Sequence, residues 1–398
     1  MADGSAGTQA ARSRLPAGIW ALGFVSLLMD VSSEMIHSLL PVFMVTGLGA
    51  SMLLVGLVEG VAEATALIVK VFSGAWSDWL GRRKPLALLG YGLGAASKPL
   101  FAISTSTGMV LAARLIDRVG KGMRGAPRDA LVADLARPEQ RGAAYGLRQS
   151  LDTVGAFLGP IIAIGLMLLW ANDFHAIFWV AVIPAVLSVA LLAFGVREPD
   201  RPAGHARVNP IRRENLRLLR PAYWWVVGIG ALFTLARFSE AFLVLRAQQG
   251  GLAIAWAPLV LIAMNVVYSL GAYPFGRLAD TMSHRKLLAL GLVVLIAADV
   301  ALAWSDRGVV LWTGIVLWGL HMALTQGLLA TMVADTAPAA LRGTAFGVFN
   351  LASGLALLLA SVFAGLLWDR LGGASTFIAG AAISALALAA LAWKAPGP

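Results

Sequence analysis

The sequence is dominated by apolar stretches of about 20 residues that recur from Ile19 to Trp393. At a rise of about 1.5 Å per residue, each stretch is long enough to cross a hydrocarbon layer about 30 Å thick. Hydrophobic residues make up 59% of the 398 residues and charged residues 13%, against about 45–50% and about 25% in soluble domains. The chain therefore cannot cover itself with polar surface, and we predict an all-α integral membrane protein.

Twelve membrane-spanning helices are predicted. The connections on one side of them carry most of the cations, whereas the opposite connections near Gly49, Thr105, Gly250 and Ser305 carry almost none. Because basic connections stay in the cytoplasm, both termini are expected there, in a protein of the cell inner (plasma) membrane. The expected spans are 17–46, 51–75, 85–104, 108–133, 142–170, 174–196, 222–247, 253–278, 285–304, 309–334, 343–368 and 374–394.

An internal repeat divides the chain. Residues 131–146 match residues 332–347, and Asp134 and Asp335 each lie seven residues before an Arg-Gly pair. The sequence around Asp78 matches that around Asp280 at nearly the same offset. The repeat predicts an N-terminal six-helix half (1–196), a cytoplasmic linker (197–221) and a C-terminal six-helix half (222–398). Two such halves place a substrate site near the middle of the membrane, between them.

Three motifs resemble those of the major facilitator superfamily. The first is the family's loop between the second and third helices, GAWSDWLGRR, with a degenerate second copy in which Ser283 and His284 replace glycine and arginine. The residues of these two copies are Gly74, Asp78, Gly81, Arg82, Arg83, Asp280 and Arg285. An acid at a helix end and arginines in a tight turn pair in one conformation and part in another, so we expect a cytoplasmic gate here.

The other two motifs lie in the fourth and fifth spans. RVGKG (118–122) resembles the family's fourth-helix arginine motif, with Lys121 where glutamine is common. Gly155, Gly159 and Pro160 in GAFLGP resemble the fifth-helix motif of the antiporter subgroup, without its closing glycines. The resemblance covers essentially the whole chain and implies twelve helices, alternating access and energy from an ion gradient, as in the proton-coupled antiporter and efflux subgroup.

Ionisable residues inside the spans are the candidate site residues, because such groups are costly in a membrane unless they are paired or hydrated. Asp30, Glu34 and His37 lie on one face of the first helix, and Glu59 and Glu63 lie four apart in the second. Clustered carboxylates beside a histidine favour a proton relay. The alternative to a proton relay is that these carboxylates only form structural ion pairs. A divalent metal site on the face of the first helix is a less favoured alternative, and no metal site is predicted.

The fourth helix supplies the opposing charges Arg118, Lys121 and Arg124. We expect Arg118 to pair with Asp30 or Glu34 and to be released when the carboxylate is protonated. Lys70 and Lys98 are expected to reach toward an interface. In the second half the candidates are fewer and are expected to shape the substrate wall: Arg237, Glu240, Arg246, Asp299, His321, Thr325 and Gln326.

The favoured function is a proton-coupled exporter of a small amphipathic or drug-like molecule. Alternatives of the same fold carry an organic anion, a siderophore-like metabolite or a divalent metal ion, and a lipid flippase or a non-transporting sensor belongs to another class. We expect a monomer with a small-molecule substrate, protons and the lipid bilayer as partners, and no cofactor. Nucleic acid is not expected, because the net charge of +10 is not gathered in one polar domain. An enzyme is not expected either, because no nucleotide-binding loop, nucleophile elbow or helical zinc motif occurs.

Overall fold

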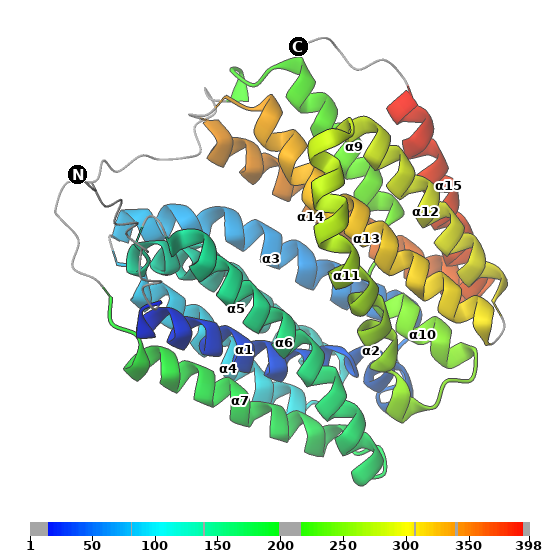
Figure 1. Cartoon of the computed structure of the whole chain (residues 1–398). Helices are drawn as coiled ribbons and strands as arrows, with labels where there is room; N and C mark the ends of the chain where they lie inside the picture. The colour runs from blue at the N-terminus through cyan, green and yellow to red at the C-terminus, as the bar shows by residue number, and fades with distance from the viewer. Residues whose placement is uncertain are drawn as a thin grey trace, which may run out of the picture.

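Long helices joined by short connections make up the described part of the chain (Figure 1). The structure is a computed structural model that describes residues 15–80, 82–137, 140–198, 216–305, 308–338 and 341–392, without the side chains of residues 74, 75, 77–80, 279, 280 and 326. The first half contains α1 (Ala17–His37), α2 (Leu40–Val42), the π-helix η1 (Phe43–Gly47), α3 (Met52–Leu80), α4 (Lys84–Ala102), α5 (Thr107–Leu135), α6 (Arg141–Leu169) and α7 (Phe174–Gly195). The second half contains α9 (Pro221–Ala236), α10 (Ala241–Gln249), the 3-10 turn η3 (Ile254–Trp256), α11 (Leu259–Thr281), α12 (His284–Trp304), α13 (Val309–Thr336), α14 (Arg342–Leu371) and α15 (Gly373–Ala392).

These elements form twelve helical spans, six in each half, and confirm the predicted fold class. Ten of the spans are long and apolar enough to cross a membrane by length and composition, and α4 and α5 fall outside that set. Helix α5 falls outside that set because it carries a row of charged side chains. Arg114, Asp117, Arg118 and Arg124 of that row are buried, so they turn into the bundle rather than toward lipid.

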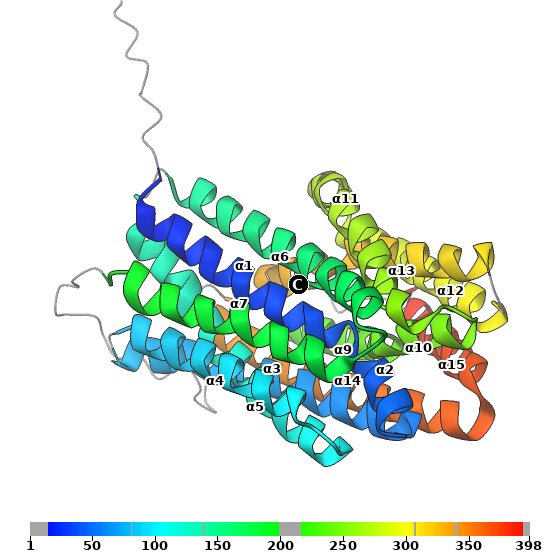
Figure 2. The same ribbon diagram turned by 90° about the horizontal axis from the view of Figure 1, so that it is seen from below.

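Among the described residues, the apolar core shared by the two halves lies at one end. The largest cluster of buried apolar side chains runs from α1 and α2 in the first half to α10, α11 and α13 in the second. Two smaller clusters each stay within one half, around Tyr91 in the first and Tyr223 in the second. Besides the long contact between α3 and α14, the halves meet where α2 contacts α10 and where α6 contacts η3 and α11, and the other helices diverge from there (Figure 1, Figure 2). Apart from α3 and α14, the helices of the two halves are therefore joined at one end and parted at the end that carries the chain termini.

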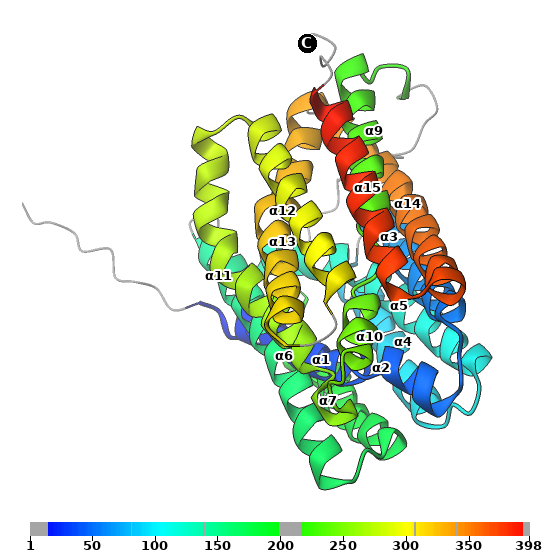
Figure 3. The same cartoon turned by 90° about the vertical axis from the view of Figure 1, so that its right-hand side faces the viewer.

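Helices α3 and α14 form the most extensive contact between the halves (Figure 3). Glycines on both helices let the backbones approach: a Cβ on Gly60 would lie 3.0 Å from Cα of Leu358. The carboxylate of Asp369, near the end of α14, accepts hydrogen bonds from the backbone N–H groups of Met52 (3.0 Å) and Leu53 (2.9 Å) at the start of α3. Close small-residue packing is how membrane helices associate without a hydrophobic driving force.

The first span of each half is interrupted, which corrects the two continuous helices predicted over 17–46 and 222–247. After His37 the α-helix stops and resumes at Leu40, next to Pro41, which has no N–H to continue the helical ladder. In the second half the helix stops at Ala236 and resumes at Ala241. There the N–H of Ser239 donates instead to the hydroxyl of Ser361 on α14, at 3.2 Å.

The α3–α14 contact predicts that Gly56→Ala destabilises the protein. A Cβ there would overlap the backbone carbonyl of Ser361, and overpacking of this kind costs about 1–3 kcal/mol. Gly92→Ala is the matched control, because nothing lies within 4 Å of a Cβ at that helical glycine. Thermal unfolding in detergent should show a lower midpoint for Gly56→Ala and no loss for Gly92→Ala; equal midpoints would contradict the tight α3–α14 contact.

Candidate functional site

The charged face of α5 forms the centre of the site. Arg114 and Arg118 lie one helical turn apart and face Glu59 and Glu63, which are spaced in the same way on α3. Nη2 of Arg114 lies 2.6 Å from Oε2 of Glu59, and Nη1 of Arg118 lies 3.0 Å from Oε1 of Glu63. Two parallel arginine–glutamate pairs therefore tie α5 to α3 inside the first half.

His37, the last residue of α1, lies against the guanidinium group of Arg118. Nη2 of Arg118 is 2.8 Å from Nε2 and 2.9 Å from Nδ1 of the imidazole ring. Because a guanidinium group can only donate, a hydrogen bond between the two groups requires one ring nitrogen to accept, which only the neutral ring can do. Oδ2 of Asp117 lies 3.5 Å from Nε2, and Oε1 of Glu34 lies 3.9 Å from Nδ1. A proton taken up by His37 would remove the acceptor for Arg118 and place a cation beside these two carboxylates.

Asp117 connects this cluster to α4. Its Oδ1 lies 2.7 Å from Nζ of Lys98, which also donates to the hydroxyl of Ser33 on α1 at 3.0 Å. Its Oδ2 lies 3.2 Å from Nε of Arg118. The prediction that Lys98 reaches toward an interface is wrong, because Asp117 provides a counter-charge deep in the bundle, where Lys98 is fully buried.

A cavity of about 330 Å³ opens between this charged face and the second half. From the second half it is lined by the interruption between α9 and α10, including Arg237, Phe238 and Glu240. Nη2 of Arg237 lies 3.8 Å from Oε1 of Glu240, which is a loose ion pair. The volume falls within the range of about 300–1,000 Å³ typical of small-molecule sites. From the first half the lining residues include Glu34, His37, Pro41, Glu59, Glu63, Arg114, Arg118 and Lys121.

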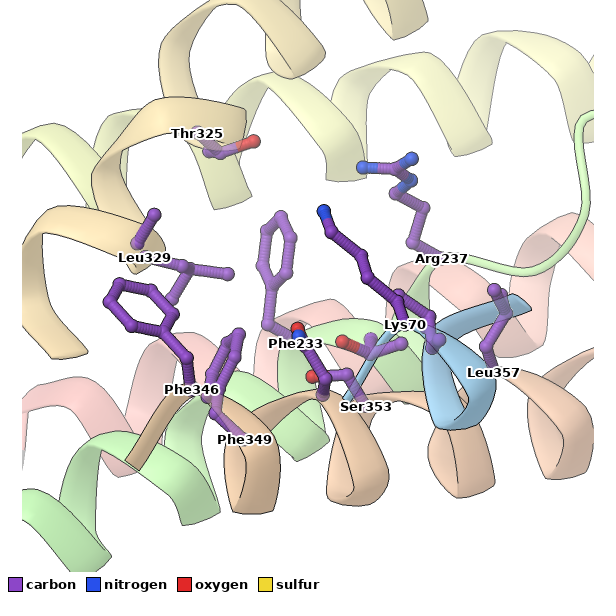
Figure 4. A pocket seen from close by; sticks show the side chains of 13 residues that line it. Lys70, Phe233, Arg237, Thr325, Leu329, Phe346, Phe349, Ser353 and Leu357 are labelled. Atoms are coloured by element: carbon purple, nitrogen blue, oxygen red, sulfur yellow. The ribbon is translucent and has the colours of Figure 1, made fainter. Parts of the chain in front are cut away.

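A second cavity, of about 370 Å³, lies next to the first and shares Arg237 and Leu357 with it (Figure 4). It is bounded by α3, α9, α13 and α14, and so it also lies between the two halves. Two adjoining cavities at the interface of two six-helix halves are the arrangement expected of a carrier that exposes a site alternately to each side of a membrane.

Comparisons with known proteins agree with this architecture. The family profile described as Major Facilitator Superfamily matches residues 22–361. The chain belongs to the major facilitator superfamily. An uncharacterised MFS-type transporter of Methanocaldococcus jannaschii is 32% identical over 379 residues, 93% of either chain. A multidrug resistance protein, MdtH of Edwardsiella ictaluri, is 26% identical over 83% of this chain and 81% of that protein.

A solved structure with a similar fold is that of a bacterial homolog to the human lysosomal transporter Spinster, in an inward-facing and unoccupied conformation. It has a TM-score of 0.77 and 17% sequence identity, and the alignment covers 95% of this chain and 97% of that one. Membership of the superfamily indicates a multi-pass membrane transporter with a small-molecule substrate rather than an enzyme.

In this facilitator the expected pairing of Arg118 with Asp30 or Glu34 is wrong. Arg118 pairs with Glu63 and Asp117 instead, because α5 packs along α3. Asp30 has no ion pair within 4.0 Å in the described part of the chain and lines neither cavity. Arg124 also lines neither cavity; its guanidinium carbon lies 4.8 Å from the centroid of the Tyr91 ring.

The fifth-helix motif of the facilitator packs directly on the carboxylates of α1. A Cβ on Gly159 would lie 2.8 Å from Cβ of Glu34, and a Cβ on Gly155 would lie 3.0 Å from Cβ of Asp30. Pro160 is buried beside them within α6. Small residues at these positions therefore let α6 approach the charged face of α1.

The gate motif of the facilitator is described only in part. The side chains of Gly74, Asp78 and Asp280, and all of Gly81, lie outside the described residues. Arg82 is exposed, and Arg285 donates to the backbone carbonyl of Ala392 at 2.7 Å. Nη1 of Arg83 lies 3.0 Å from Oδ2 of Asp134, and Nδ1 of His284 lies 3.7 Å from Oδ2 of Asp335. Asp134 and Asp335, which match in the repeat, thus each pair with a residue of the loop motif or of its second copy, and the gating role stays a prediction.

Sequence reasoning missed Arg114, although it lies four residues before Arg118 and therefore on the same helix face. Of the predicted polar residues of the second half, Thr325 lines the second cavity, whereas Asp299 and His321 lie in apolar surroundings. Asp299 is fully buried, and neither carboxylate oxygen has a hydrogen-bond partner among the described residues. His321 is also fully buried and packs between the rings of Phe233 and Trp318. Neither Asp299 nor His321 lines the two cavities.

The contrast between Asp117 and Asp299 predicts opposite effects of the same substitution. Asp117→Asn removes the counter-charge of Lys98 and Arg118, and breaking a buried pair on one side costs about 3–5 kcal/mol. Asp299→Asn removes a buried carboxylate that pairs with no described residue, so the stability should be unchanged or higher. Thermal unfolding of both variants in detergent is the measurement, and an equal loss in the two would mean that the Asp117 pairs contribute little.

Proposed function

We propose that this transporter is proton-coupled and exports a small amphipathic or drug-like molecule across the inner membrane by alternating access. The observation that carries the proposal is His37. Its ring lies 2.8 Å from Nη2 of Arg118 at the wall of a cavity between the two halves, and in its neutral form it can accept a hydrogen bond from that group. Histidine changes charge near neutral pH more readily than any other side chain, so it suits a proton site.

Protonation of His37 would change the electrostatic interactions between the two halves. The groups around it come from five places: Glu34 on α1, Glu59 and Glu63 on α3, Lys98 on α4, Arg114, Asp117, Arg118 and Lys121 on α5, and Arg237 and Glu240 at the interruption of the second half. Protonated His37 no longer accepts from Arg118 and is drawn toward Glu34 and Asp117. Since the cavity wall includes Arg237 and Glu240, this added charge favours one conformation of the pair of halves over the other.

Alternating access is supported by the way the halves are joined. Among the described residues, they share an apolar core near α2 and α10, and each has its own core at the other end. With both termini in the cytoplasm, as predicted, the joined end is the outer one and the cavities face inward. Rocking of the halves about the α3–α14 contact would then close the cavities to the inside and open them to the outside. Arg83 and Asp134 would lie near the cytoplasmic gate.

Two observations favour a direction and a cargo. The partial antiporter motif around Gly159 and the multidrug resistance relative favour export of drug-like molecules. Transport of an organic anion is the second candidate, and it is favoured by the cations Lys70 and Arg237 in the second cavity. Both candidates use the same proton site.

The proton site predicts that His37→Gln uncouples transport from the pH gradient. Glutamine can still accept from Arg118 but cannot gain a proton, so substrate exchange without a gradient should persist while gradient-driven accumulation is lost. His175→Gln is the matched control, because His175 interacts with the carbonyl of Ala102 and lines neither cavity. The measurement is substrate accumulation in vesicles under an imposed pH gradient, with a drug-like fluorescent substrate.

Full gradient dependence in the His37→Gln vesicles would reject His37 as the coupling residue. Asp30→Asn and Glu34→Gln then separate the remaining possibilities. Loss of coupling in Glu34→Gln alone would assign the proton to the carboxylate beside His37, and loss in Asp30→Asn alone would move it outside the cavity, toward the start of α1.

A further inference from the structure

The second cavity carries cationic charge with no acidic residue to balance it. Thirteen residues line it, and none of these described residues is acidic. Its two cations come from different halves, Lys70 from α3 and Arg237 from the interruption after α9. Figure 4 shows the ammonium group of Lys70 and the guanidinium group of Arg237 reaching into the same space. Two neighbouring cations repel in a region of low dielectric, and a bound anion would remove this cost.

Neither cation is fully neutralised by the protein. Lys70 has no ion pair within 4.0 Å in the described part of the chain, and its side chain is exposed to the cavity. The partner of Arg237 is Glu240, at 3.8 Å, and Glu240 lines the other cavity. An anion between Lys70 and Arg237 would therefore meet one free cation and one loosely paired cation.

An unpartnered hydroxyl group lies in the same wall. Ser353 on α14 is 9% exposed, and its Oγ has no hydrogen-bond partner among the described residues. Buried hydroxyl groups in proteins normally have a partner, so an unpaired one at a cavity wall points to a ligand. Asn350, three residues before it on the same helix, also lines the cavity and adds amide donors.

The rest of the wall is apolar and rich in aromatic rings. Phe233, Phe346 and Phe349 line the cavity together with Leu67 and Leu329. In Figure 4 the three rings lie on the side away from Arg237, beyond Lys70. The cavity thus has a cationic end and an aromatic end, which is the pattern that binds an amphipathic ligand.

We propose that this cavity binds an amphipathic organic anion. Its carboxylate, phosphate or sulfonate head lies between Lys70 and Arg237 and accepts from Ser353, and its apolar body packs on Phe233, Phe346 and Phe349. This inference rests on the proposed transport function and names the substrate class. A lipophilic cation fits poorly here, because it would have to displace or tolerate both protein cations.

The test is equilibrium binding of naphthoate to the detergent-purified full chain, with the uncharged naphthamide as the matched ligand. Lys70→Met should lower the affinity for naphthoate by about 10- to 100-fold, the effect of losing a charged hydrogen bond. Ser353→Ala should lower it by up to about tenfold. Lys286→Met is the control variant, because Lys286 is an exposed lysine at the start of α12 that lines neither cavity. Unfolding midpoints without ligand establish that each variant is folded.

A second probe separates the two sources of such an anion. Lysophosphatidic acid carries the same head chemistry on a lipid chain. Binding of naphthoate but not of the lipid, with the Lys70 dependence, supports a soluble organic anion as the ligand. If both ligands bind, or if the lipid alone binds, and Lys70→Met weakens that binding, the anion site is supported and a lipid headgroup is identified as an occupant.

Three results would overturn the proposal. The first is naphthamide binding as tightly as naphthoate, which would mean that charge is not recognised. The second is a loss of affinity in Lys121→Met with none in Lys70→Met, which would place the anion in the other cavity. The third is tetraphenylphosphonium binding that strengthens in Lys70→Met while naphthoate does not bind. Because binding is measured without a gradient, these failures leave proton coupling through His37 untouched, and failure of the His37 test leaves anion binding untouched.

Discussion

The pairing of the charges on α5 is the interaction on which the rest of the structure depends. A span with this many ionisable groups could not lie in a membrane by itself, and a buried charge without a partner costs several kcal/mol. Glu59 and Glu63 meet this need from α3, and Lys98 and His37 approach Asp117 from α4 and α1. The same pairs fix the position of α3, the helix that packs on α14 and joins the two halves. The charge network of one half thereby holds the interface with the other.

The two halves share their helix order but not their buried charges. The repeat survives in the interrupted first span of each half and in Asp134 and Asp335, which each pair with a basic residue of the loop motif, Arg83 in the first copy and His284 in the second. It does not extend to the network around Arg118. In the second half, Asp299 and His321 lie among apolar side chains away from both cavities. This asymmetry favours a division of labour in which the first half carries proton coupling and the second completes the substrate wall.

Much of the fold was predictable from the sequence, because apolar length, basic connections and the repeat determine the number and order of the spans. The partners of the charges were not predictable, because they depend on which helices pack together and how each is rotated. Arg118 was expected to reach Asp30 or Glu34 but reaches Glu63, and Lys98 turned out to be buried against Asp117. The second cavity escaped prediction for the same reason: its lining comes from four helices far apart in the sequence. The helix interruption at Arg237 was also not predictable, because it contains no proline, whereas Pro41 marks the interruption near His37.

Arg237 connects the two proposals physically. It lies on the interrupted segment, lines both cavities, and sits 3.8 Å from Glu240, beyond the reach of a direct hydrogen bond. An anion held by Lys70 would compete with Glu240 for this guanidinium group. If Arg237 turns toward the anion, Glu240 loses its counter-charge in the cavity where His37 meets Arg118. A single side chain at a break in a helix is thus a physical link between the two cavities, and cargo in one cavity would change the charge balance in the other.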